Sequence, residues 1–237
     1  MKTIKTLAVV GFLSTLLSCN TSSIKGDGNI QSEQRPIASF KKIEIGGNWE
    51  VIVTQGETES LKIEADKNLL DLIETKVDGD ALIIGTKNNK SLSSEKGFKA
   101  YLTFKNLDKI ELSGAVKLSA PSRLIFDKLN IEGSGAAEIN LDLNAKQLDA
   151  EMSGGSQTIL KGSINEVHFT LSGAGSLSAL ELESNKFTVD ISGAGTAEVS
   201  VKDELNATIS GAGSVSYKGN PVVKKDISGA GKIFQLK

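Results

Sequence analysis

The chain has very little of the side chains that most often carry catalysis or bind metal. Among its 237 residues are one cysteine, one histidine and one tryptophan, which excludes zinc fingers, iron–sulfur clusters and Cys/His nucleophile pairs. Arginine is scarce too, since only Arg35 and Arg123 are present, and no basic cluster is interleaved with aromatic residues. We therefore expect no cofactor and no nucleic-acid partner. With 39% hydrophobic and 24% charged residues, the chain still has enough apolar surface for one substantial core.

The first 18 residues have the composition of an export signal. Lys2 and Lys5 give it a positive start, and its apolar run, from Leu7 to Leu17, is too short to cross a membrane. Residues 16–19, LLSC, resemble a bacterial lipoprotein box, in which cleavage precedes the cysteine and the thiol takes a diacylglycerol. The resemblance implies a lipoprotein signal peptide over residues 1–18 and acylation, palmitate included, at Cys19. An ordinary signal peptide followed by a free thiol is the alternative.

Residues 19–36 are expected to form a lipidated N-terminus and linker, and residues 37–237 a single domain. Removal of the leader takes away two lysines and leaves 25 basic against 29 acidic residues, a net charge near −4 that suits no polyanionic partner. The sequence NTSS after Cys19 has no acidic run of the kind expected of a surface-export signal. We therefore expect a lipid-anchored protein of the cell envelope, held at the outer membrane, with the periplasmic face favoured over the cell surface.

Seven copies of a short motif, most clearly SGAG, recur after residue 107 at spacings of 18 to 21 residues. Between the copies, apolar and polar residues alternate with a period of two, with neither a helical stripe nor Asn-Gly hairpin turns. Such strands pair with their equivalents in the next repeat, as in a parallel sheet. The pattern predicts an all-β fold, a parallel β-helix with about 19 residues per coil.

Each motif is expected to form a corner of its coil. Corners stacked on one another need residues that are small and free to take positive φ, which favours glycine. A phosphate cradle would need a helix after the motif, whereas a strand such as TAEVSV follows, and a calcium-binding repeat would need aspartate. The predicted corner glycines, one per coil, are Gly114, Gly133, Gly154, Gly173, Gly193, Gly211 and Gly229.

An outward-facing column of polar residues is expected three places before each of these glycines. Its members are Glu111, Asn130, Glu151, Thr170, Asp190, Thr208 and Asp226. Acidic and neutral residues alternate in this order, which would separate like charges on a solvated face. The second interpretation is that the acidic members bind cations or sugar hydroxyls, and it makes Glu111, Glu151, Asp190 and Asp226 candidate binding residues.

His168 is expected to point outward, one coil away from Asp149. It is either an ordinary surface histidine or a general base that Asp149 orients. Because no nucleophile is singled out beside it, no catalytic residue is assigned.

The pattern weakens upstream of residue 100 but persists. KIEIGG at residues 42–47 matches KIELSG at 109–114, so the β-helix is expected to begin near residue 37. Strands are expected over residues 61–65, 81–85 and 100–104, a short helix or strand over 68–77, and a mobile polar loop over 85–99. The open end of the first coil needs a cap. Trp49 is expected to pack in this terminal region, with stacking on a sugar as the alternative.

Three blocks in order, FKKIEIGGNWEVIVTQGE, LKIEADKNLLDLIETKVDGDALII and the SGAG coils, resemble the auto-transporter adhesin head domain known as GIN, over residues 37–237. The resemblance implies a right-handed parallel β-helix outside the cytoplasm, often lipid-anchored. It brings no defined catalytic or binding residues.

We therefore expect a non-enzymatic, envelope-anchored scaffold or adhesin-like protein, with the membrane as a partner through its lipid and glycans or other envelope proteins as ligands. The main alternative is a polysaccharide-active enzyme, a lyase or glycoside hydrolase, because such enzymes share this architecture. They place carboxylates in a groove walled by long loops, whereas the tight corners and few insertions after residue 106 build a poor cleft. A purely structural role is the third alternative.

Overall fold

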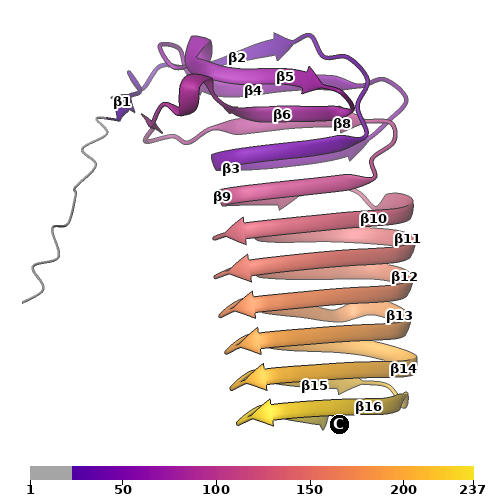
Figure 1. The fold of residues 1–237 in the computed structure, drawn as a ribbon. Coiled ribbons are helices and arrows are strands. Elements are labelled where there is room, and N and C mark those ends of the chain that lie inside the picture. Colours follow the sequence, from indigo (N-terminus) through magenta and orange to yellow (C-terminus); the bar gives the residue numbers. More distant parts are fainter. Residues whose placement is uncertain (1–22) are drawn as a thin grey trace, which may run out of the picture.

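The computed structural model describes residues 23–237, which wind into a right-handed parallel β-solenoid of about seven turns (Figure 1). Residues 24–104 hold the first coil and the cap that covers it. Cys19 and the expected signal peptide lie outside the described residues. Within the described part, no helix is long and apolar enough to cross a membrane.

The elements fall into two groups along the chain. The cap and first coil contain β1 (Ile24–Lys25), β2 (Ile30–Arg35), β3 (Lys42–Gln55), β4 (Ser60–Asp66), the 3₁₀ turn η1 (Leu70–Leu72), β5 (Ile73–Asp78), β6 (Ala81–Thr86), the 3₁₀ turn η2 (Lys87–Asn89), β7 (Leu92–Ser93) and β8 (Lys99–Phe104). The later coils contain β9 (Lys109–Ser119), β10 (Leu124–Gly135), β11 (Glu138–Gly154), β12 (Gln157–Gly173), β13 (Ser176–Gly193), β14 (Thr196–Gly211), β15 (Ser214–Lys218), β16 (Val222–Gly229) and β17 (Lys232–Gln235).

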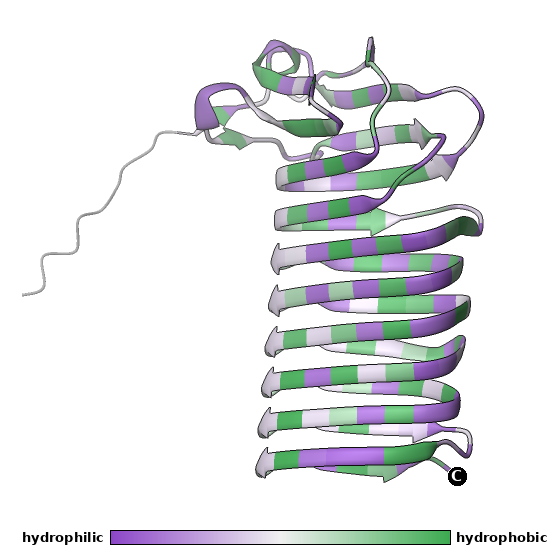
Figure 2. Cartoon of the chain, turned by 45° about the vertical axis from the view of Figure 1, so that its right-hand side comes forward, coloured by the Kyte–Doolittle hydropathy of each residue, from purple (hydrophilic) through white to green (hydrophobic). Residues whose placement is uncertain are grey.

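Strands from successive coils pair in parallel, so equivalent residues stack along the axis of the solenoid. Apolar and polar residues alternate along each strand, as the bands of Figure 2 show. Phe169, Val189 and Ala207 form one inward column and are at most 2% exposed. A single apolar core runs through cap and coils. These observations confirm the predicted all-β parallel β-helix.

The first glycine of the SGAG motif is required by its conformation and by its neighbour. Gly193 has a φ of 122°, and a Cβ placed on it would lie 2.5 Å from the carbonyl oxygen of Gly173 in the preceding coil. That oxygen accepts a hydrogen bond from the Ala194 N–H at 2.9 Å. The close stacking therefore keeps the backbone ladder continuous around the corner. Positive φ is found at six of the seven glycines assigned to corners.

The second glycine of the motif is required by packing inside the solenoid. Gly213 is buried, and a Cβ on it would lie 2.7 Å from Cγ2 of Ile191 in the preceding coil. The isoleucine side chain thus occupies the volume that a side chain at residue 213 would need. This packing explains why both glycines recur although each contributes little apolar surface.

The corner assigned to Gly133 is wrong, and the corner glycine of that coil is Gly135. The strand register pairs Gly135 with Gly114 and Gly154, and Gly135 has a φ of 94°. Gly133 instead takes a buried inward position, and the side chain of Met152 occupies the space that a Cβ on Gly133 would need. The stretch EGSG contains two candidate glycines, and the one that follows serine makes the turn. The register of this coil consequently differs by two residues from the predicted one.

The cap covers the edge of the first coil with antiparallel strands, as an open solenoid end requires. β8 pairs with β3 and β4, β2 is the outermost strand, and β5 and β6 form an antiparallel pair beside β3. The strands predicted over residues 61–65, 81–85 and 100–104 are confirmed as β4, β6 and β8.

The structure of three segments near the N-terminus departs from the sequence-based expectation or decides between two expected forms. Residues 19–36 are not wholly a linker, because β1 pairs with β7 and β2 completes the otherwise open edge of β4. The stretch over residues 68–77 holds both expected forms, a 3₁₀ turn and then a strand. The polar segment over residues 85–99 was expected to be a loop, but it contains η2 and β7, and the pairing with β1 organises it.

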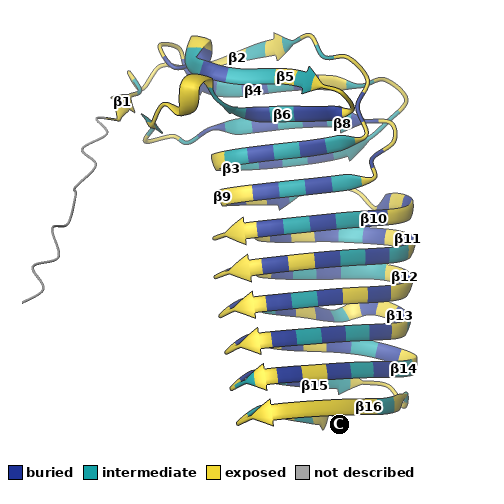
Figure 3. Ribbon diagram, viewed as in Figure 1, coloured by how far each residue is buried: buried dark blue, intermediate teal, exposed yellow. Residues whose placement is uncertain are grey.

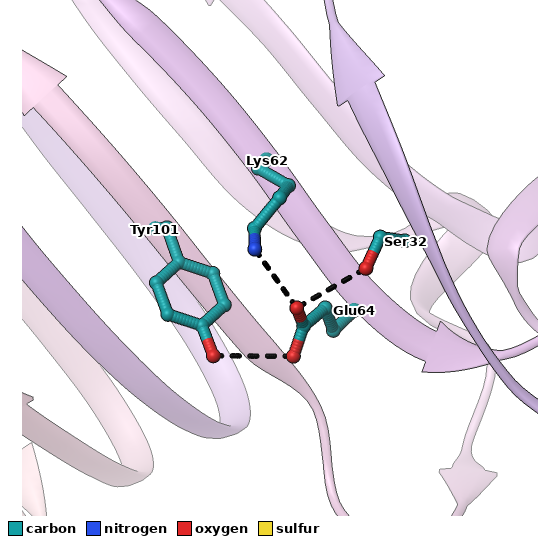
Figure 4. A network of polar contacts seen from close by, with 4 residues as sticks. All are labelled: Ser32, Lys62, Glu64 and Tyr101. Carbon is teal, nitrogen blue, oxygen red and sulfur yellow. Dashed lines mark hydrogen bonds and ion pairs between the residues drawn. The ribbon is translucent and has the colours of Figure 1, made fainter.

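A polar network joins three strands of the cap (Figure 4). The Glu64 carboxylate accepts hydrogen bonds from Lys62 Nζ at 2.9 Å, Ser32 Oγ at 3.1 Å and Tyr101 Oη at 3.1 Å. The hydrogen bond from Lys62, followed by those from the two hydroxyls, holds the pKa of Glu64 below its usual 4.5 even though burial opposes this. The charged carboxylate therefore links β2, β4 and β8.

The last coil is the most exposed part of the solenoid (Figure 3). β16 pairs only with β14 and β17 only with β15, so their outer edges have no strand partner among the described residues. Val222 is 67% and Phe234 49% exposed. Lys225 takes the inward position that Ala207 holds one coil earlier. A lysine at such an edge discourages other strands from pairing with it.

Replacing Gly193 with valine should lower the free energy of unfolding by about 2–4 kcal/mol, since the new side chain is strained at positive φ and collides with a backbone carbonyl. Gly229→Val meets the same contact, 2.5 Å from the Gly211 oxygen, but should cost less because the last coil can yield without displacing another. Gly155→Ala is the matched control, since nothing lies within 4 Å of its Cβ position. Urea midpoints measure all three, and a Gly193→Val midpoint equal to that of the parent would contradict stacked corners.

Candidate functional site

A groove of about 870 Å³ lies where the cap meets the glycine corners of the first coils. One wall is the outer face of β3, β9, β10 and β11. The other is β6 together with the arm, our name for residues 87–93, which contain η2 and β7. β1 fixes the arm, because the Ile24 N–H donates to the Ser91 carbonyl oxygen at 2.9 Å and the Gly26 N–H donates to that of Ser93 at 2.8 Å. The groove thus depends on the pairing of the N-terminal segment with the arm.

Four glutamates stack in successive coils along the coil wall of this groove. The register places Glu44 beside Glu111, Glu111 beside Glu132, and Glu132 beside Glu151. Neighbouring strands are about 4.8 Å apart, so the four side chains form a continuous row, which we call the carboxylate ladder. Thr170 ends it in the next coil. The predicted alternation of acidic and neutral residues is therefore wrong at its start, since Glu132 rather than Asn130 lies between Glu111 and Glu151.

Lys109 pairs with both middle members of the carboxylate ladder and offsets one of their two negative charges. Its Nζ lies 2.6 Å from Glu111 Oε1 and 2.8 Å from Glu132 Oε1, and it is 26% exposed. Its hydrogen bond to Glu111, and then that to Glu132, raise the pKa of Lys109 above 10.5. Among the described residues, Glu44 and Glu151 at the ends of the ladder form no ion pair. The ladder thus has a middle that is ion-paired and partly compensated, and two ends without an ion pair among the described residues.

The aromatic side chains of the lining pack against each other, and little of their surface faces the groove. Trp49 is 3% exposed, its ring centroid lies 5.3 Å from that of Phe98, and its Nε1 donates to the Gly46 carbonyl oxygen at 3.1 Å. A sugar needs an open aromatic face to stack on, and little of the indole is accessible. The structure therefore favours the packing role expected for Trp49.

Several residues singled out in the sequence lie apart from the groove. The Asp190 carboxylate is 3.1 Å from His168 Nε2, and Asp226 is exposed on the last coil. Asp149 pairs with Lys128 Nζ at 2.8 Å rather than with His168, so the suggested general-base pair is not formed. Within residues 23–237, no three or more His, Cys, Asp or Glu side chains are arranged so that they could hold a metal ion.

Sequence reasoning missed Glu44 and Glu132 as members of the site. The signal is present: the segments KIEI, KIEL, NIEG and DAEM all carry glutamate at their third position, and aligning them on that residue gives the observed register. The arm could not be inferred in this way, because the groove forms only when residues distant in the chain come together.

Phe98→Ala removes the ring that packs against the only tryptophan. We expect Trp49 to emit as a buried indole in the parent and at longer wavelength in the variant, with a loss of about 3–5 kcal/mol in unfolding free energy. Fluorescence spectra with acrylamide quenching measure this, and Phe234→Ala is the control because that ring is 49% exposed in the last coil. Ready quenching of the parent would show that Trp49 is not packed as described.

Residues 39–221 match the model of a domain family described as "Putative auto-transporter adhesin, head GIN domain". No curated protein matches the chain significantly. Three similar solved structures are described as putative adhesins and come from Bacteroides fragilis, Parabacteroides distasonis and Parabacteroides merdae.

Their sequence identities are 23%, 22% and 22%, and their TM-scores are 0.85, 0.75 and 0.69. The alignments cover 90%, 91% and 91% of this chain and 100%, 100% and 99% of those chains. At such identities these structures establish the fold, whereas the family match spans most of the sequence. The chain therefore belongs to the auto-transporter adhesin head GIN domain family.

Proposed function

We propose that the protein is an adhesin-like binding protein of the cell envelope, without enzymatic activity, that takes its ligand in the groove beneath the cap. The groove itself carries the proposal, because it gathers carboxylates and hydroxyls around a space of about 870 Å³. Ligand sites commonly measure roughly 300–1,000 Å³. Membership of the adhesin head family supports the envelope or surface setting.

The carboxylate ladder makes a glycoside hydrolase the strongest alternative function. Adjacent strands hold their residues about 5 Å apart, near the carboxylate spacing of retaining enzymes. Those enzymes flank the scissile bond with their two carboxylates, and one of the two must stay protonated. Glu132 and Glu151 stand side by side on one wall, and Glu132 is 41% exposed. The arrangement suits binding better than cleavage.

The lipid anchor belongs to the same proposal. The arm wall of the groove would lie close to the membrane, because Ile24 follows Cys19 by five positions in the sequence, a separation of at most about 18 Å in an extended chain. Ile24 is hydrogen-bonded to Ser91 in the arm, while the last coil lies at the opposite end of the solenoid (Figure 1). An anchored molecule would therefore hold its groove near the bilayer.

Cys19→Ala should release the protein from membranes, because acyl chains on this residue provide an anchoring that nothing else in the mature sequence replaces. Fractionation of cells into soluble and membrane parts measures the change. Ser22→Ala serves as the control and should stay with the membranes. Retention of Cys19→Ala in the membrane pellet would overturn the lipoprotein assignment.

Ser134→Trp should block the groove, because Ser134 is an exposed residue of its lining and an indole there would occupy the space. Ser228→Trp places the same side chain at the equivalent corner of the last coil, outside the groove. We expect glycan arrays and pull-downs from envelope fractions to give ligands that the parent and Ser228→Trp retain and Ser134→Trp loses. Equal retention of the ligands by all three proteins would exclude the groove as the ligand site.

The same preparations should release no fragments from polysaccharides. Turnover that disappears in Glu151→Gln would contradict the non-enzymatic assignment and favour the hydrolase.

A further inference from the structure

Resting on the proposed function, we infer that the groove takes an extended peptide segment of another envelope protein with two basic side chains four residues apart. Its lining contains five glutamates, Glu44, Glu74, Glu111, Glu132 and Glu151, and a single lysine, Lys90. Such a lining favours cationic groups and repels acidic glycans and anionic headgroups.

The compensation already present in the groove determines where the ligand's charges should lie. Glu74 pairs with Lys76 at 3.2 Å, and Lys109 bridges Glu111 and Glu132. The uncompensated carboxylates are therefore Glu44 and Glu151, at the two ends of the ladder. A ligand gains most by placing one cation at each end and a neutral group over the middle.

The spacing of these two ends matches an extended peptide. Glu44 and Glu151 are three strand spacings apart, which is about 14 Å. In an extended chain the rise is about 3.4 Å per residue and alternate side chains share a face. Residues i and i+4 therefore point the same way at about 14 Å, and residue i+2 falls over Lys109.

The rest of the lining favours a peptide over a sugar. Trp49 offers little open ring for stacking at 3% exposure. Exposed serines instead follow the ladder along the corners, at Ser113, Ser134 and Ser153. Each hydroxyl donates to a main-chain carbonyl oxygen of the preceding coil, so its lone pairs remain to accept hydrogen bonds from a ligand. The N–H and C=O groups of a peptide main chain need such partners when they leave water.

The test uses isothermal titration calorimetry as the readout, because Trp49 is only 3% exposed and its emission does not depend on a direct contact with the ligand. Two blocked nine-residue Ser/Thr peptides of equal charge are titrated in low salt: one has lysines at its third and seventh positions, the other at its third and fourth. We expect the first to bind up to about fivefold more tightly, because it can form one more exposed ion pair than the second. Added salt should weaken its binding.

Two variants should change peptide binding in different ways, and a third is the control. The double change Glu44→Gln and Glu151→Gln should abolish the preference between the peptides. Lys109→Asn, which installs the residue found at the same register position in the next coil, should tighten binding of both because it removes the positive charge that offsets Glu111 and Glu132. Asp226→Asn, in the last coil, is the control and should leave both affinities unchanged.

Equal affinity for the two peptides would overturn the inference, as would spermine binding more tightly than either, which would indicate a polyamine site. If no probe binds while Ser134→Trp still abolishes capture of envelope ligands, the inference fails and the proposed groove function stands. If Ser134→Trp has no effect on capture, the proposed function fails with it.

Discussion

Successive coils of this solenoid meet at a contact that leaves no room for a side chain. The Gly173 carbonyl oxygen accepts the Ala194 N–H at 2.9 Å, and a Cβ on Gly193 would lie 2.5 Å from the same oxygen. A slip of one residue would bring a side chain into this space and turn the apolar face outward. The corner therefore fixes the register of the strands that enter and leave it. Inward and outward columns, including the row of glutamates, follow from that register.

The carboxylate ladder is the least favourable consequence of this register. Two unit charges 4 Å apart repel by about 1 kcal/mol in water, and like charges directly opposite each other weaken strand pairing. Lys109 offsets part of the repulsion, and the solvent exposure of Glu111 and Glu132, 40% and 41%, screens the remainder. Later coils place threonine or aspartate in this column, in the order Thr170, Asp190, Thr208 and Asp226, so the fold does not need glutamate there. A local departure from the best choice for stability is typical of a functional surface.

The strands, their pairing and most corners depend on short-range periodicity and were predicted from the sequence. The prediction failed where two registers fitted the residues about equally well. Alternation and the 18- to 21-residue spacing were sufficient for the strands, the parallel pairing and six corners. Gly133 was mistaken for a corner because EGSG contains two candidate glycines, and the strand register, the positive φ of Gly135 and the packing of Met152 against Gly133 show which of them turns the chain. The groove could not be predicted, since it forms where β1, from a segment taken for linker, pins the arm against the coils. Such long-range pairing leaves no periodic trace in the sequence.

The register of the second coil is the central claim, because it decides whether the glutamates adjoin. Cysteine pairs report it directly in a Cys19→Ala background. Glu111→Cys with Glu132→Cys puts two Cα atoms about 4.8 Å apart, within reach of a disulfide. Glu111→Cys with Asn130→Cys is a diagonal pair at about 7–8 Å, beyond that reach. Mild oxidation should cross-link the first pair and leave the second reduced, and cross-linking of the second pair alone would contradict the register and the carboxylate ladder with it.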